Sequence, residues 1–334
     1  MDWSKGFTSA FYAYVIDPVT WRETEKLNIT SGSISRSLEG LRDACDVTII
    51  GSQGTEKWIR VYMECEQDGA SARIPLFTGL TSNPERNIQG GTEENTLKCY
   101  SILKPAQDIL LDRGYYVPVD ISGDLIIKDL LSVIPAEVVV NGQAPSLRNA
   151  IIAEEGENHL SMVDKVLNAL NWRMRLQGTG TIELCPMTLD AEVEFNPLDN
   201  DIIEPSISIS NDWYDCPNVF RAVQGDLTAV AKDESPQSPF SIENRGREVW
   251  QEETSAQLNT GENITEYARR RLRELQRVSI TASYQRRFIP GLTCGDLARS
   301  RYEQLDGLFR ITSQNIKLSY GGTTTEEVEL YEYN

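Results

Sequence analysis

Short stretches in which apolar and polar residues alternate are the feature that most constrains how this chain can fold. Residues 58–65 alternate in side-chain character, so that every second side chain faces one side of a pleated strand. Residues 74–80 and 97–103 are further short runs rich in branched and aromatic side chains, with a Gly- and Asn-containing turn at 87–91. Strands of this length and spacing predict a β-barrel or a β-sandwich in the first third.

The middle third has a different periodicity. Residues 124–133 suit a short helix, and residues 160–170 carry apolar side chains at steps of three and four, which predicts an amphipathic helix. Two strands are expected on either side of a turn at 178–180. The middle third is therefore predicted to be mixed α and β.

The last third returns to strands after a polar stretch at 196–201, which we take as a boundary. The segment 231–247 is rich in Ser, Pro and charge and predicts a loop. The alternating runs predict strands at 207–210, 219–223, 278–284 and 316–320, the last turning at 321–323 and returning as 328–331 in a hairpin.

The best-signalled helix of the chain starts near Asn263. Asn263 and Glu266 have capping-box spacing, and Glu266 is placed for an ion pair with Arg270 one turn later. The expected buried stripe comprises Ile264, Ala268, Leu272 and Leu275. Four arginines, at 269, 270, 271 and 273, cannot all pair along the helix; they form either a solvated face or a surface that docks an acidic neighbouring subunit.

Length and charge limit the classes of protein. With 334 residues, two or three domains are expected, because single cores stop growing at roughly 250–300 residues. The formal charge of −18, from 32 basic and 50 acidic residues, argues against a broad nucleic-acid-binding face. No apolar run is long enough to span a membrane, and the N-terminus lacks the pattern of a secretory signal, so we expect synthesis in the cytoplasm. The six cysteines show no CxxC spacing and are expected to be reduced and buried.

No residue is predicted to be catalytic, cofactor-binding or metal-binding. His159 is the single histidine and precedes a helix, which suits a capping or surface role better than a general base. Asp199 and Asp201 lack the rest of a calcium loop, and the glycine pairs at 90–91 and 321–322 lack the Lys of a P-loop. The expectation is therefore an interaction scaffold without a cofactor.

Several segments resemble the hub proteins of phage tails, baseplates and related contractile injection systems. PNVFRAV at 217–223 resembles that family's strand into its second barrel, and ITSGSISR at 29–36 resembles its opening strand. Further similar segments are AKDESP at 231–236, SIENRGR at 241–247, and the helix YARRRL at 267–272 followed by a strand.

This resemblance implies an α+β, mainly β fold with two tube-type β-barrel domains, an intervening α/β domain and a helical excursion. The implied domains are a first barrel at 1–112, the α/β domain at 113–195, a second barrel at 196–232 and 278–334, and a loop-and-helix excursion at 233–277. It also implies a homotrimer that forms a pseudo-sixfold ring, joins the hexameric tail tube to a threefold spike or tip, and lines the ejection channel.

The implied partners are the tail tube or distal tail protein, the spike or tip protein and other baseplate proteins, with the tape-measure protein as a further one. DNA would pass through the channel without specific binding, and no membrane insertion is implied. The implied location is the virion tail or baseplate, assembled in the host cytoplasm. Two alternatives stay open: a carbohydrate-binding β module that recognises a cell surface, and a cell-wall glycosidase or peptidase.

Overall fold

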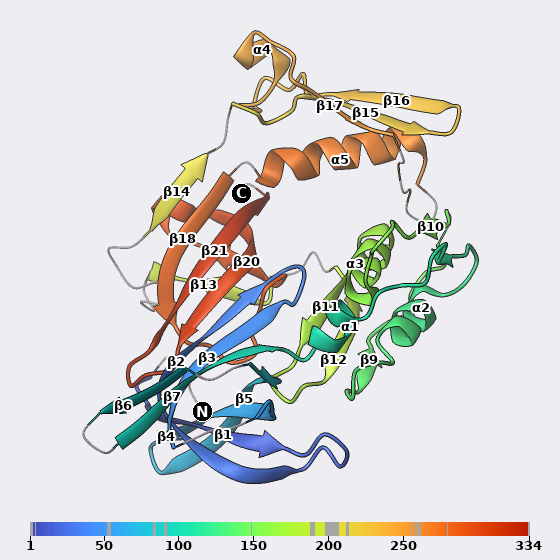
Figure 1. Cartoon of the computed structure of the whole chain (residues 1–334). Helices are drawn as coiled ribbons and strands as arrows, with labels where there is room; N and C mark the ends of the chain where they lie inside the picture. The colour runs from blue at the N-terminus through green and yellow to red at the C-terminus, as the bar shows by residue number, and fades with distance from the viewer. Residues whose placement is uncertain are drawn as a thin grey trace.

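The chain is mainly β, with a smaller helical part, as the computed structural model shows (Figure 1). This confirms the predicted α+β, mainly β class. The structure describes residues 3, 5–51, 55–82, 85–89, 92–147, 149–187, 191–197, 207–211, 214–254, 256, 258, 262–278 and 280–332. No helix in these ranges is long and apolar enough to cross a membrane.

Six antiparallel strands close on themselves to form the first barrel. Around the ring they follow the order β1, β4, β5, β7, β3, β2, and β2 pairs back with β1. The strands are β1 (Thr8–Ile16), β2 (Glu23–Ser37), β3 (Asp43–Ile50), β4 (Trp58–Gln67), β5 (Ala70–Thr81) and β7 (Thr92–Ser101), with β6 (Glu85–Gln89) paired to β7. The interior is apolar because every second residue points inward; Ile59, Val61 and Met63 are buried there, as the alternation predicts.

The second barrel region continues the same sheet. The C-terminal part of β2 pairs with β20 (Gly307–Lys317), from Ser33 opposite Lys317 to Ser37 opposite Ser313. Beyond β20 the sheet continues through β21 (Thr323–Glu332), β18 (Ile280–Arg287) and β14 (Ser208–Asn211). On a side branch, β19 (Leu297–Ser300) pairs with both β20 and β13 (Val193–Phe195). A short 3-10 helix, η2, spans Glu303–Leu305. One long strand thus belongs to both barrels, and the predicted C-terminal hairpin is confirmed as β20 and β21.

The α/β unit forms a separate core beside the first barrel (Figure 1). The predicted helices are confirmed as α2 (Gly123–Leu130) and α3 (His159–Leu170), which pack on each other. The predicted strand pair is β11 (Trp172–Leu176) and β12 (Ile182–Pro186), and β12 also pairs in parallel with β9 (Val138–Val140). The other elements are α1 (Lys104–Asp108), β8 (Tyr116–Val117) and β10 (Ile151–Ile152).

The excursion is a three-stranded sheet laid on a helix, and it differs from the expectation. Strands β15 (Val219–Gln224) and β16 (Leu227–Lys232) are expected in the second barrel, but β15 pairs with β16 on one side and with β17 (Trp250–Glu253) on the other. They leave the barrel because Phe220 and Ala222 pack under helix α5 (Ile264–Val278). Part of the predicted loop at 231–247 is the short helix α4 (Ile242–Arg245).

Strand β13 also departs from the expectation, because it joins the large sheet rather than the α/β unit. Strand pairing shows only that β13, β15 and β16 belong to sheets other than those expected, and the predicted boundaries at 112, 195, 232 and 277 as a set remain predictions.

Helix α5 has the predicted cap but not the predicted ion pair. The Asn263 side chain accepts hydrogen bonds from the backbone N–H groups of Thr265 and Glu266, both at 3.0 Å, and the Glu266 carboxylate accepts from the Asn263 N–H at 3.0 Å. The capping box is therefore confirmed. Arg270 pairs instead with Glu262 and Glu274, because the Glu266 carboxylate already serves the cap.

Candidate functional site at the seam between the barrels

Charged side chains meet under the strands where the two barrels join. We call this group the seam, and it consists of Arg36 on β2, Gln314 on β20, Glu326 on β21 and Arg286 on β18. Arg36 and Gln314 are register partners across the β2–β20 pairing, as are Gln314 and Glu326 across the next one. Because directly paired residues face the same side of a sheet, the side chains form a continuous row.

The row is held by hydrogen bonds. The Arg36 guanidinium donates to Gln314 Oε1 at 3.4 Å and to the Leu76 carbonyl of the first barrel at 2.9 Å. The Gln314 amide donates to Glu326 Oε1 at 2.6 Å, and Arg286 donates to the same oxygen at 2.5 Å. Polar contacts therefore link strands of both barrels.

The ion pair between Arg286 and Glu326 is withdrawn from solvent, with 1% and 0% of the two side chains exposed. Arg286 Nε and Glu326 Oε2 have no hydrogen-bond partner among the described residues. Beside the pair, burial first and the Glu326 carboxylate second raise the pKa of Tyr284 well above its usual value. Removing one member of such a pair leaves an uncompensated buried charge, so the pair constrains the geometry more than it adds stability.

A second group of charges joins the second barrel to the α/β unit. Asp296, only 1% exposed, lies 2.7 Å from a guanidinium nitrogen of Arg173 and 3.3 Å from one of Arg175, both on β11. It also accepts the Thr293 backbone N–H at 2.8 Å. Burial raises the pKa of Asp296, although the arginines and the backbone hydrogen bond oppose that effect.

The turn from β2 into β3 binds the α/β unit in a similar way. Arg42 Nη2 lies 2.5 Å from Asp164 Oδ1 on α3, and the Gly40 N–H donates to the same carboxylate at 3.3 Å. The next residue, Asp43, is buried, and this burial raises its pKa from 3.8 to about 7 against the opposing effects of Ser101, Arg36 and Arg42.

The β11–β12 turn docks on the first barrel. Thr78 of β5 donates to the Gly178 carbonyl at 2.7 Å, and Arg60 of β4 donates to the Thr179 carbonyl at 2.6 Å. A Cβ added to Gly178 would stand 2.0 Å from the Pro75 carbonyl oxygen. Only glycine fits this close approach, which explains the glycine at this position of the predicted turn.

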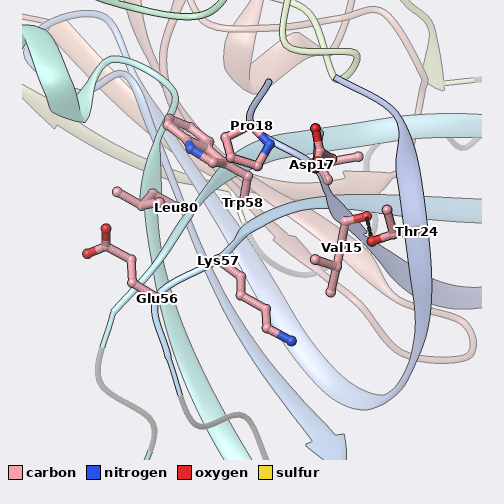
Figure 2. A pocket seen from close by; sticks show the side chains of 9 residues that line it. Val15, Asp17, Pro18, Thr24, Glu56, Lys57, Trp58 and Leu80 are labelled. Atoms are coloured by element: carbon pink, nitrogen blue, oxygen red, sulfur yellow. Dashed lines mark hydrogen bonds between the residues drawn. The ribbon is translucent and has the colours of Figure 1, made fainter. Parts of the chain in front are cut away.

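A hollow of 370 Å³ lies at one end of the first barrel, where β1 turns into β2 (Figure 2). Two of its charged residues are already engaged: Asp17 accepts the N–H groups of Val19 and Thr20, and Lys57 pairs with Glu25 at 3.4 Å. Glu56 also lines the hollow and has no partner among the described residues. The ring of Trp58, on the wall of the hollow, contacts the ring of Trp21, with the two ring planes inclined at 59°. The hollow offers no unengaged charge pair for a ligand and is better explained as the rim of the barrel.

The candidates weighed from sequence lie apart from one another. His159 Nδ1 is 2.9 Å from the Leu130 carbonyl, so the ring ties the start of α3 to the end of α2. Gly321 and Gly322 form the β20–β21 turn. Asp199, Asp201 and the glycine pair at 90–91 lie outside the described residues. In the described part of the chain, no three His, Cys, Asp or Glu side chains are grouped to hold a metal ion.

None of the six cysteines is in a disulfide, and all six are buried, as predicted. Burial raises the pKa of the Cys294 thiol, close to the seam, to about 12. These thiols are therefore inert side chains of the core.

The sequence did carry a signal for the seam. On β18, inward positions alternate through Ala282, Tyr284 and Arg286, so a charged side chain occupies a position where the pattern requires burial. Glu326 and Val328 of β21 are inward in the same way. A charged residue in phase with a buried face indicates a partner elsewhere in the fold.

Solved structures of phage-type tail proteins share this fold. No protein-family model matches the sequence, and no curated protein sequence matches it. The 43 kDa tail protein of prophage MuSo2 from Shewanella oneidensis is 14% identical, with a TM-score of 0.67 over 96% of this chain and 97% of that one. A tail protein from Neisseria meningitidis is 16% identical, with a TM-score of 0.69 over 96% of each chain.

A prophage tail protein from Listeria monocytogenes is 11% identical, with a TM-score of 0.60 over 97% of this chain and 95% of that one. The similarity therefore includes both barrels, the α/β unit and the excursion. At these identities it establishes architecture, and along nearly its whole length the chain has the fold of phage-type tail proteins.

Proposed function

We propose that the chain is a structural hub subunit of a phage-type tail or baseplate, without catalytic activity. Three copies would form a pseudo-sixfold ring that joins the hexameric tail tube to a threefold spike or tip and lines the ejection channel. The observation that carries this proposal is the shared strand β2, which fixes two barrel regions in one chain. The fold common to tail proteins of similar length supports it.

The contacts of the seam bear on the symmetry of the proposed ring. A subunit that occupies two of six positions needs its two barrel regions at a constant angle, since closed rings tolerate little variation in the rotation between neighbours. The hydrogen bonds from Arg36 on β2 to Gln314 on β20 and to the Leu76 carbonyl of the first barrel suit this requirement, because a change of angle would break them. The buried Arg286–Glu326 pair in turn holds Gln314, which donates to Glu326.

The proposed partners are the tail tube or distal tail protein, the spike or tip protein and other baseplate proteins, with a tape-measure protein as a further one. The net charge of −18 suits a wall that DNA passes without adhering, because carboxylates repel phosphate. We expect lumen-facing strand positions to carry more Asp and Glu than Lys and Arg. The proposed location is the virion tail or baseplate, after synthesis in the host cytoplasm.

The test is the solution mass of the purified chain by light scattering, followed by end-on electron microscopy of the particles. A mass of three times 37.6 kDa and rings with six lobes would support the proposal. A monomer at all accessible concentrations, or a ring with a basic lumen, would contradict it.

The alternatives predicted from sequence have their own assays. A carbohydrate-binding module needs a row of exposed aromatic rings, whereas Trp172 is buried and Trp21 and Trp58 pack against the α/β core. Retention on glycan columns would nevertheless favour that module over the hub. Loss of turbidity of bacterial cell walls would favour a glycosidase or peptidase.

A further inference from the structure

The outer face of helix α5 carries two exposed arginines beside the capping Glu266, in a protein that is acidic overall. Its inner face, with Ala268 and Leu272, packs on the sheet of β15, β16 and β17, and its C-terminal end lies against β21 and β18 of the second barrel (Figure 1). Arg269 and Arg273 project from the opposite face and are exposed. The helix therefore connects the excursion to the second barrel and leaves one charged face toward solvent.

The four arginines of this helix separate into two pairs. Arg270 is bound by Glu262 and Glu274 at 2.8 Å each, and Arg271 by Glu274 at 2.7 Å and Glu253 at 3.3 Å. These two side chains are satisfied within the subunit.

Arg269 and Arg273 form no ion pair with any described residue. The one hydrogen bond between them runs from Arg273 Nε to the Arg269 carbonyl at 3.4 Å, which leaves both guanidinium ends available. Like charges one helical turn apart destabilise a helix slightly, and nothing in the described part of the subunit accounts for this arrangement.

We infer that Arg269 and Arg273 dock onto an acidic surface of a second copy of this chain. The inference rests on the proposed ring. Charge complementarity identifies the occupant: the chain has 50 acidic and 32 basic residues, so each neighbouring copy presents an excess of carboxylates. A ring also requires two different patches on each subunit, one meeting the other head to tail, and a basic helix face with an acidic counterpart meets that requirement.

The test compares R269E/R273E with K98E/K128E, which makes the same change in net charge at exposed lysines elsewhere. Light scattering of the full chain at salt concentrations from about 0.05 to 0.5 M would measure self-association. We expect R269E/R273E to raise the dissociation constant by about tenfold or more, and circular dichroism to show that both variants are folded. The control should stay close to the wild type.

A second variant identifies the docked surface. R269K/R273K keeps the charge and supplies amines that a carbodiimide couples to carboxylates in direct contact. In a mixture of ¹⁵N-labelled and unlabelled protein, we expect mass spectrometry to find mixed-isotope crosslinks from positions 269 or 273 to Asp or Glu.

The outcomes separate this inference from the proposed function. Self-association that R269E/R273E leaves unchanged, or that the control weakens equally, would overturn the inference and leave the ring standing. Crosslinks confined to one copy would overturn it as well. A wild-type chain that stays monomeric under all conditions would overturn both.

Discussion

Replacing one residue of the buried ion pair of the seam should lower the free energy of unfolding more than replacing both residues together. Arg286→Met leaves Glu326 charged at 0% exposure, and Glu326→Leu leaves Arg286 charged at 1%. Each single substitution should lower the free energy of unfolding by about 3–5 kcal/mol, the cost of an uncompensated buried charge. The double variant removes both charges and deprives Gln314, Tyr284 and the Arg287 carbonyl of a hydrogen-bond partner, so its cost should be about 1–3 kcal/mol, well below the sum of the two single costs.

Urea unfolding at neutral pH, followed by circular dichroism, would measure all three variants against the wild type. Arg113→Met is the matched control, because Arg113 pairs with Glu155 while 87% exposed, and such pairs add little stability. The control should unfold at the wild-type midpoint. If the double variant lost the sum of the two single costs, the two charges would not be coupled, and the argument that the buried pair constrains the geometry of the seam would fail.

Three further predictions concern other contacts. Burial holds the pKa of Asp43 at about 7, above its usual 3.8, so between these pH values the folded state keeps a proton that the unfolded state releases. The free energy of unfolding of the wild type should therefore fall as pH rises from about 3.8 to about 7. Asp43→Asn should abolish that decline, as measured by urea midpoints at pH 5 and pH 8. Gly178→Ala should cost about 1–3 kcal/mol and lower the melting temperature, because the new methyl group meets the Pro75 carbonyl. Asn263→Ala should cost about 1 kcal/mol through loss of the helix cap at Thr265 and Glu266, and faster amide exchange in the first turn of α5 would report it.

Local patterns predicted elements well and sheet membership poorly. The alternation at 58–65 and the three- and four-residue spacing at 160–170 correspond to β4 and α3, because burial on one face imposes those periods directly. The strand at residues 219–223, which is β15, was also predicted correctly, but the sheet to which it belongs was not. A strand with a buried face packs equally well on a barrel or on a helix, so its partner is decided by the distant apolar stripe of α5.

The seam was missed for a related reason. Arg286 has the phase of a buried residue, but its carboxylate partner lies 40 residues later on β21, and only the sheet order brings the two together. Arg36 is further still from Gln314, 278 residues along the chain. Contacts between residues so far apart leave no recognisable spacing in a single sequence, whereas the Asn263–Glu266 cap, three residues apart, was predictable.

The charged residues discussed above therefore form two groups, those neutralised by a partner inside the subunit and those without such a partner in its described part. The Arg286–Glu326 pair of the seam is balanced inside the subunit, out of contact with water, so altering it should change unfolding before it changes assembly. Arg269 and Arg273 are balanced by nothing in the described part of the subunit, so altering them should change association while the unfolding midpoint stays the same. Measuring both properties on both sets of variants separates the two roles. If a seam variant kept wild-type stability and still failed to assemble, the division would be wrong, because a buried pair would then act directly between subunits.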